Sequence, residues 1–288
     1  MSLESEHSVT HFNSAASSQG SPLRILSNTF RDLWEWRALA QILAIRDIQA
    51  QYRQSILGIL WAFLPPLVLS VGLSVANANG IVKPGETSIP LPAYVFISMT
   101  LFQIFFASLQ GPINGLWGAK GVLTRVTFPR ETIVLAEVIK LPITFLIQIF
   151  GIVVFFIWFK LPFGWTTLLA PFSFLLLIML GVTIGLLLTP IALLYRDLSS
   201  ALGILMFVWL SFTPVAFPPN DYPGFFATTV RLNPVTPLLV TTRELALNQV
   251  LTYPENFVIV GIGTVLLFFV GLIFFRLSMP MVIERWSS

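Results

Sequence analysis

The sequence predicts an all-α, polytopic membrane protein with six transmembrane helices. Of its 288 residues, 56% are hydrophobic and only 10% are charged, whereas soluble chains carry about a quarter charged residues. The hydrophobic residues are gathered in long runs separated by short polar segments, and about 20 apolar residues suffice to cross a bilayer. These observations exclude an ordinary water-soluble domain.

The chain is expected to begin with a polar tail and a surface-lying helix. Residues 1–29 are Ser-rich and contain both histidines, so they are predicted to form a flexible cytoplasmic tail. Residues 30–47 mix apolar side chains, including tryptophans, with charged ones. This segment is too polar to cross a bilayer, and its composition predicts an amphipathic interface helix with indole rings at headgroup depth.

Charge-free runs define the predicted spans. No charged residue occurs between Ser55 and Asn79, a run long enough to cross with tilt. Five further apolar runs follow, separated by short loops. The six predicted spans cover about residues 55–79, 93–117, 132–159, 166–194, 200–217 and 257–275. Residues 30–288 are therefore expected to form a single transmembrane domain.

The basic residues predict the orientation of these spans. An even number of spans places both termini on one side of the membrane. Of the 16 Lys and Arg residues, only Lys83, Lys160, Arg231 and Arg243 fall on the opposite side. Because cytoplasmic loops carry an excess of Lys and Arg, both termini are predicted to be cytoplasmic in a multi-pass membrane protein.

Residues 218–256 are expected to lie on the outer face without crossing the membrane. They contain two short mixed stretches, Gly224–Leu232 and Val235–Leu247, joined at Asn233–Pro234, where a turn is favoured. Neither stretch is long enough to span. They predict a re-entrant or interfacial helical hairpin, which must be covered by protein or water; a plain extracellular loop is the open alternative.

Small residues in two spans predict close helix contacts. Gly111 and Gly115 lie four residues apart in the second span, and Gly181 and Gly185 do so in the fourth. Such pairs let neighbouring backbones approach each other in membranes.

Residues typical of enzyme sites are few. The sequence contains no GxxxxGK[ST] loop and no cysteine, and both histidines are in the tail, so no catalytic, cofactor-binding or metal-binding residues are expected. The net charge of +3 argues against nucleic acid as a partner.

Glu137 and Lys140 lie within the third span, near its cytoplasmic end, and are interpreted as a boundary ion pair with a snorkelling lysine. Without a central acid relay, energy for uphill transport is expected from another subunit.

Five motifs, in this order, resemble those of ABC-2-type transporter permeases, in particular the branch that exports polysaccharides such as O-antigen, capsule and teichoic acid. The resemblance covers residues 30–286. The motifs are YRQSILGILWAFLPP at Tyr52–Pro66, FPRE at Phe128–Glu131, YRDL at Tyr195–Leu198, TPVAFP at Thr213–Pro218 and NPVTPL at Asn233–Leu238.

The resemblance implies a homodimer of this chain bound to two copies of a separate ATPase subunit, which would bind ATP and Mg. The implied substrate is an undecaprenyl-diphosphate-linked polysaccharide that passes between the protomers. Two short cytoplasmic loops would contact the ATPase. The residues expected to form this contact are Arg125, Phe128, Pro129, Arg130, Glu131, Arg196 and Asp197.

Aromatic rings are candidates for lining such a pathway, because they can support the apolar faces of sugars, and a cation at the mouth would suit a diphosphate. The candidate pathway residues are Arg53, Trp61, Phe63, Phe102, Phe105, Phe106, Phe207, Trp209 and Phe212, with Gln103, Gln110 and Asn114 as polar neighbours. Three alternatives stay open: an ABC-2 exporter of a drug or lipid, an ATP-independent carrier or channel, and a structural membrane scaffold.

Overall fold

The computed structural model describes residues 22–53, 58–119 and 131–287. Within these residues the regular elements are helices, which agrees with the predicted all-α fold. The elements, in order, are α1 (Pro22–Glu35), α2 (Arg37–Arg53), η2 (Gly58–Ala62), α3 (Leu64–Ala78), α4 (Leu91–Gly118), α6 (Glu131–Trp158), η3 (Trp165–Leu169), α7 (Ala170–Leu194), α8 (Arg196–Ser211), η4 (Pro219–Asp221), α9 (Gly224–Leu232), α10 (Val235–Ala246) and α11 (Pro254–Ser287).

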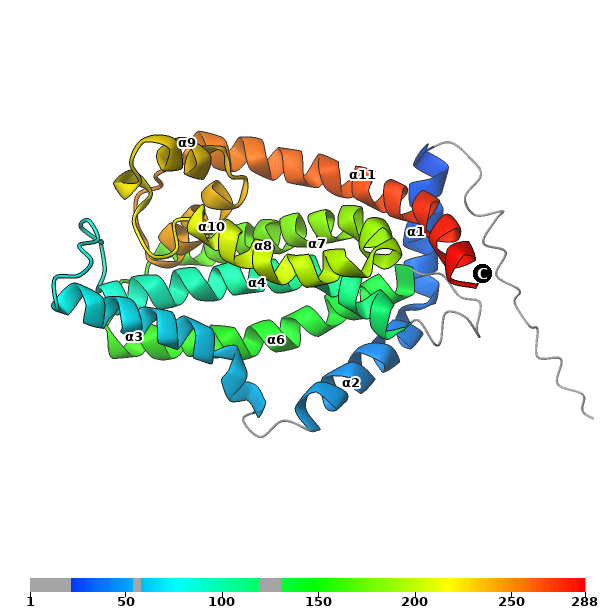
Figure 1. Cartoon of the computed structure of the whole chain (residues 1–288), viewed down its shortest axis with the longest axis horizontal. Coiled ribbons are helices and arrows are strands. Elements are labelled where there is room, and N and C mark those ends of the chain that lie inside the picture. Colours follow the sequence, from blue (N-terminus) through cyan, green and yellow to red (C-terminus); the bar gives the residue numbers. More distant parts are fainter. Residues whose placement is uncertain (1–21, 54–57, 120–130, 288) are drawn as a thin grey trace, which may run out of the picture.

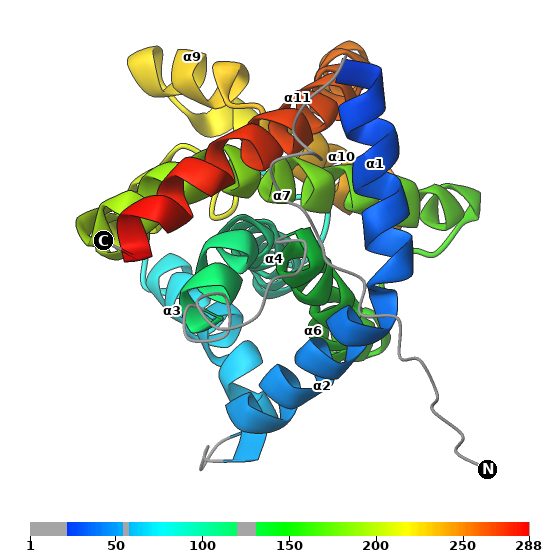
Figure 2. The ribbon, with the colours of Figure 1, turned by 90° about the vertical axis from the view of Figure 1, so that its right-hand side faces the viewer.

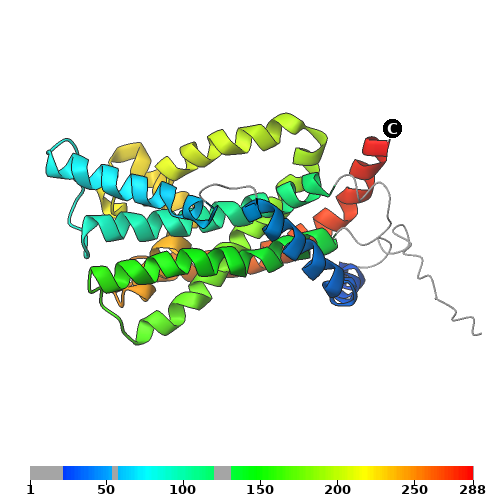
Figure 3. The ribbon, with the colours of Figure 1, turned by 90° about the horizontal axis from the view of Figure 1, so that it is seen from below.

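The long helices form an elongated bundle with α4 at its centre (Figures 1 and 3). Helices α3, α6 and α7 surround α4 when the bundle is viewed along its axis in Figure 2. Most side chains of α4 are buried, including Phe96, Phe102 and Phe105. We name the two ends of the bundle by helices that lie there. The α1 end carries α1 and the C-terminal part of α11, and the α9 end carries α9 and the loop before α4 (Figure 1).

Helices α4 and α7 touch at the predicted glycine pair. A Cβ atom added at Gly181 would collide with the carbonyl oxygen of Phe105, and one added at Gly185 would collide with that of Leu109. Backbone therefore meets backbone at this crossing, as expected for small residues four apart. The second pair, Gly111 and Gly115, lies instead against the Glu137 side chain of α6.

Four helices are long and apolar enough to cross a membrane, by length and composition: Leu91–Gly118, Glu131–Trp158, Trp165–Leu194 and Pro254–Val282. They match four of the predicted spans within a few residues at most boundaries, although α11 continues to Ser287. The first and fifth predicted spans contain the shorter apolar helices Leu64–Ala78 and Ser200–Ser211. The count of six spans therefore stays a prediction.

The first predicted span, 55–79, is not one continuous helix. A 3₁₀ segment, Gly58–Ala62, precedes α3, and a proline occupies the first turn of α3. Proline lacks the N–H needed inside a helix but fits a helix start. The Pro65–Pro66 pair therefore begins a new helix.

The predicted interface helix, 30–47, is two helices that meet at Trp36, and helix begins at Pro22, inside the predicted flexible tail. Figure 2 shows α1 and α2 running in different directions. At the bend, Arg37 Nη1 donates to the carbonyl oxygen of Trp34 at 2.7 Å, and the guanidinium lies 4.4 Å from the Trp34 ring centroid. A side chain that inserts into the backbone hydrogen-bond pattern of a helix, here by bonding to a carbonyl oxygen, is a recognised cause of a bend.

The predicted outer hairpin corresponds to α9 and α10, which meet at Asn233–Pro234. The Asn233 amide makes four hydrogen bonds. Its Nδ2 donates to Phe212 O and Thr213 Oγ1, at 2.9 and 3.0 Å, and its Oδ1 accepts from Trp209 Nε1 and Val235 N, at 3.0 and 3.1 Å. This uses the full capacity of an asparagine amide and joins the TPVAFP and NPVTPL motifs.

Helix α10 is buried from Val235 to Leu245 against α7, α11 and α4. Its Arg243, which is 3% exposed, donates to Ser98 Oγ at 2.7 Å and to Pro214 O at 3.2 Å, and lies 4.0 Å from the Tyr94 ring centroid. The segment is therefore helical, and protein covers α10, as a short helix among apolar ones requires. That the hairpin re-enters the membrane stays a prediction.

The contact between α4 and α7 can be tested with a glycine substitution. We expect Gly185→Leu to lower the stability of the protein by about 1–3 kcal/mol, because the new side chain meets backbone that cannot move away cheaply. The measurement is the midpoint of thermal unfolding in detergent, monitored by the far-UV circular dichroism signal of the helices. Gly263→Leu is the matched control, because a Cβ atom there meets nothing within 4 Å. Equal midpoints for the two variants would contradict the close contact.

Candidate functional site

The two loops predicted to contact an ATPase flank helices at the α1 end. The FPRE motif ends at the first residue of α6, and the YRDL motif begins α8. Figure 1 shows the start of α6 and the start of α8 at the same end of the bundle as α1, although of these two helices only α6 contacts α1 among the described residues. The α1 end is therefore where the described residues that border both predicted contact regions lie.

The predicted contact residues are only partly within the described structure. Arg125, Phe128, Pro129 and Arg130 lie outside the described residues. Arg196 is the first residue of α8, and its side chain is not described. Asp197 follows it in the first turn of α8 and is exposed, where a carboxylate favours the helix N-terminus. Asp197 is thus available to a partner.

The carboxylate of Glu131 has an internal partner. Glu131 Oε1 lies 3.6 Å from Nε of Arg276 on α11. The same guanidinium donates from Nη2 to Asp32 Oδ2 and from Nη1 to Thr29 Oγ1 on α1, both at 2.7 Å. The side chains of Arg276, Asp32 and Glu131 are 4%, 8% and 9% exposed. This Arg276 cluster joins α1, α6 and α11.

The geometry of the Arg276 cluster makes α1 an integral part of the bundle. A buried guanidinium needs carboxylates and hydrogen-bond acceptors around it, since an uncompensated charge in apolar surroundings is costly. Asp32 and Thr29 provide them from one face of α1, three residues apart. No motif or run in the sequence singles out Arg276 as a buried cation. Its partner Asp32 is 244 residues away in the sequence, so no local pattern links them.

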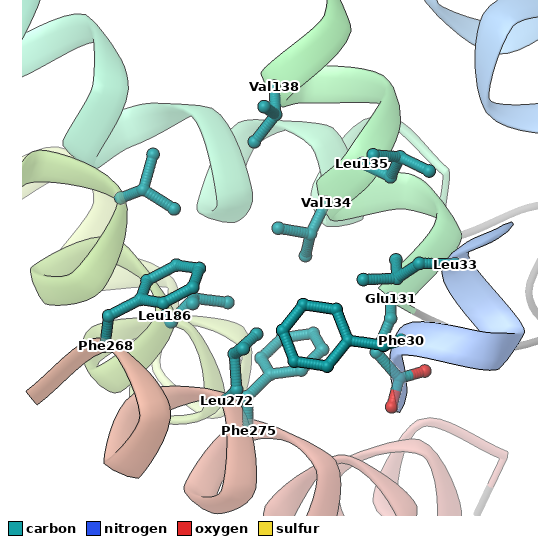
Figure 4. Close-up of a pocket in the computed structure, with 11 residues that line it drawn as sticks. Phe30, Leu33, Glu131, Val134, Leu135, Val138, Leu186, Phe268, Leu272 and Phe275 are labelled. Atoms are coloured by element: carbon teal, nitrogen blue, oxygen red, sulfur yellow. The ribbon is translucent and has the colours of Figure 1, made fainter. Parts of the chain in front are cut away.

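An apolar cavity lies beside this cluster (Figure 4). It has a volume of about 140 Å³ and is enclosed by side chains of α1, α6, α7 and α11. Figure 4 shows Phe30 and Leu33 of α1 facing Phe268 and Leu272 of α11, with the Glu131 carboxylate at the edge. Apolar side chains of α1 therefore face those of α6 and α11 across this cavity, next to the Arg276 cluster.

Three of the candidate pathway rings are core residues. Phe102 and Phe105 are completely buried, and Phe106 is 3% exposed. Phe102 lies near both of the others, with ring centroids 6.1 Å from Phe105 and 6.4 Å from Phe106. In this structure these rings do not reach the surface of the subunit, because α4 is enclosed by α3, α6 and α7.

The remaining pathway candidates are more accessible. Phe207 and Trp61 are 71% and 56% exposed, and Phe63 is partly buried against Gly151 of α6. Trp209 and Phe212 border a cavity of about 340 Å³ between α8 and α9. Arg53 is the last residue of α2, and its side chain is not described. That these residues contact a substrate stays a prediction.

A second ionic group ties α2 to α6. Lys140 Nζ contacts Glu137 Oε1 and lies 3.5 Å from Asp47 Oδ2. Asp47 Oδ1 in turn accepts from Arg46 Nε and Nη2 at 2.9 and 2.8 Å. The ion pair predicted between Glu137 and Lys140 is confirmed, and Asp47 of α2 is an additional member that the sequence analysis missed.

Removal of the buried cation should loosen α1. We expect Arg276→Met to cost about 3–5 kcal/mol of stability, because Asp32 and Glu131 would be left buried without their guanidinium partner. The measurement is the thermal unfolding midpoint in detergent. Arg31→Met is the control, since its pair with Glu35 is exposed on α1 and such pairs contribute little.

A second substitution separates charge from packing at this cluster. Adding Asp32→Asn to Arg276→Met removes one unpaired carboxylate, so the double variant should recover part of the lost stability. A double variant no more stable than Arg276→Met would show that the loss does not arise from an uncompensated charge.

The chain is similar to known proteins over most of its length. The chain is similar to "O-antigen export system permease protein RfbA" of Myxococcus xanthus, with 24% identity over 75% of this chain and 82% of that protein. It is also similar to a protein of the same name from Klebsiella pneumoniae, with 26% identity over 83% of this chain and 91% of that protein. Residues 38–247 match the family described as "ABC-2 type transporter". The chain therefore belongs to the ABC-2 transporter family of membrane proteins, as its five motifs predicted.

Proposed function

We propose that this chain is the permease subunit of an ABC transporter that exports a lipid-linked polysaccharide such as O-antigen across the inner membrane. The observation that carries the proposal is the similarity to O-antigen export permeases over 82% to 91% of their length. The family match over residues 38–247 includes nearly all of α2, the long helices α4, α6 and α7, and the α9–α10 hairpin. A permease for a bulky glycan also suits a bundle whose charged groups are confined to its ends.

The proposed assembly is a homodimer of this chain with two copies of a separate ATPase subunit, which binds ATP and Mg. The α1 end faces the cytoplasm, in agreement with the uneven distribution of basic residues. Large apolar side chains are exposed on α3 and α8, including Val68, Val71, Ile204 and Phe207. These faces are available to lipid or to a second protomer. The substrate carries an undecaprenyl-diphosphate lipid and moves between the protomers.

The proposed route of mechanical coupling begins at the loops. The ATPase contacts residues 125–131 and the start of α8, and nucleotide-driven closure moves both. Because Glu131 is the first residue of α6 and lies against Arg276, a shift of this loop is transmitted to α11 and, through Asp32, to α1. Asp197 supplies the second contact at the exposed first turn of α8.

The coupling proposal is tested best at Asp197, because its side chain is exposed. We expect Asp197→Lys to reduce both the amount of ATPase that co-purifies with this chain and the amount of glycan on the cell surface. Glu255→Lys is the matched control, as Glu255 is also an exposed acid in a helical first turn, at the α9 end of α11. Normal co-purification with Asp197→Lys, or an equal loss with Glu255→Lys, would contradict this contact.

The substrate class is tested in cells that lack the chain. Deletion should abolish surface glycan while the precursor accumulates inside, and the intact gene should restore export. Unchanged surface glycan with altered drug tolerance would favour an ABC-2 exporter of a drug or lipid. Transport in proteoliposomes driven by an ion gradient, without any ATPase, would favour an independent carrier.

A further inference from the structure

A polar hollow at the α1 end is unlike the apolar cavity beside α1. It has a volume of about 490 Å³ and lies between α2, α4 and α6, which frame this region in the end-on view of Figure 2. Its lining combines charged side chains, amides and small residues: Arg46, Asp47, Ala50, Ala107, Gln110, Gly111, Asn114, Gly115, Gly118, Glu137, Lys140 and Leu141. We call this space the α2–α4–α6 hollow.

The charged groups of the hollow already neutralise one another. Lys140 lies between the carboxylates of Glu137 and Asp47, and Asp47 also accepts from Arg46. The side chains of Lys140 and Glu137 are 19% and 11% exposed, so part of each still faces the space. Two cations and two carboxylates leave no net charge. A carboxylate has about four lone-pair sites, so those of Asp47 and Glu137 retain capacity to accept further hydrogen bonds.

The α4 wall of the hollow presents two amides with no partner. Among the described residues, no side-chain hydrogen bond is found for Gln110 or Asn114. Asn114 is exposed, and Gln110 is partly so. Two turns further along the same face of α4, the buried Oε1 of Gln103 also has no hydrogen-bond partner among the described residues. Amide groups along a helix in an apolar bundle need water or a polar ligand.

The small residues of α4 keep the wall open. A Cβ atom added at Gly115 would collide with the Glu137 carboxylate, and one at Gly111 would touch the same side chain. The glycines therefore let Glu137 lie flat over α4 with its carboxylate at the hollow. Ala107, which also lines the hollow, contributes only a methyl group to this wall.

We propose that the α2–α4–α6 hollow binds a sugar unit of the exported glycan through its hydroxyl groups. Sugar hydroxyls both donate and accept, so they match the carboxylates of Asp47 and Glu137 and the amides of Gln110 and Asn114. The apolar face of a sugar ring fits against Ala107. A phosphate suits the hollow less well, because both cations are engaged with carboxylates that would repel it.

This inference rests on the proposed export of a glycan, and it is tested first by accessibility. The chain has no cysteine, so a single Asn114→Cys can be labelled with a charged thiol reagent in the full chain with its ATPase in nanodiscs. We expect it to react about tenfold faster than Leu146→Cys, which lies on an exposed apolar surface of α6, because a wet thiol ionises more readily than one in lipid. An equally slow reaction at both positions would overturn the site.

The second measurement identifies the ligand. Nanodiscs containing undecaprenyl-diphosphate-linked oligosaccharide should slow the labelling of Asn114→Cys severalfold, whereas undecaprenyl diphosphate without sugar should not. Equal slowing by both lipids would replace the sugar site with a diphosphate site and overturn the proposal. No slowing by either would show a hollow that holds only water, which also overturns it.

The third measurement separates this inference from the proposed function. In cells without the native gene, Asn114→Leu and Gln110→Leu should each reduce surface glycan severalfold while the ATPase still co-purifies. Asn256→Leu is the matched control, an exposed asparagine at the start of α11. If the unaltered chain restores no glycan, the proposed function fails. If it restores glycan and both leucine variants do so equally well, the sugar site alone fails.

Discussion

Buried charges at the α1 end need partners, and these partners fix the positions of the two N-terminal helices. Arg276 is neutralised by Asp32 of α1, and Lys140 by Asp47 of α2 in addition to Glu137 of its own helix. An isolated charge in apolar surroundings costs several kcal/mol or more. Each N-terminal helix therefore supplies a carboxylate that a long helix of the bundle requires. This is why segments too polar to span the membrane are nevertheless integral to the fold.

The α9 end meets the same requirement with neutral groups. Arg243 is satisfied by the Tyr94 ring, the Ser98 hydroxyl and the Pro214 carbonyl. The Asn233 amide uses all its donors and acceptors at the start of α10. The Asn233 bonds join the end of α8 to the start of α10, and the Arg243 bonds join α10 to α4. Such satisfaction allows a short helix to stay buried among longer ones without crossing the membrane.

The sequence predicted those features that depend on local composition. Charge-free length placed the four long helices, and the Asn233–Pro234 turn divided the hairpin at the observed position. Features that depend on a residue distant in the sequence were not predicted. Helix α4 is apolar on nearly all sides, so its hydrophobic pattern does not distinguish a buried face from an exposed one. The pattern therefore could not predict that Phe102 is buried and Asn114 is exposed. Proline at 65 was visible, but only the structure distinguishes a helix start from a kink within a helix.

The candidate site was predictable in parts rather than as an arrangement. Gln110 and Asn114 stood out as amides in an apolar run, and Glu137 and Lys140 as charges in another. Their common environment depends on α2, whose Asp47 reaches Lys140 across a separation of 93 residues. No pattern within either helix specifies that approach. The hollow therefore becomes visible only when α2, α4 and α6 are seen together.

Proline residues add a mechanical consequence to the ionic anchors. A proline inside a helix removes one backbone hydrogen bond and weakens the helix locally. Each of the four long helices contains one proline beyond its first turn, at Pro112, Pro142, Pro190 and Pro280, all toward the α1 end. Lys140 precedes Pro142 by one turn or less, and Arg276 lies one turn before Pro280. Helices α1 and α2 are thus anchored near the prolines at which the long helices bend most readily. Gly181 and Gly185, which bring α7 into close contact with α4, lie farther from the α1 end along α7 than Pro190. Force applied at the α1 end would move the anchored ends of the helices before it disturbed their tightly packed middle.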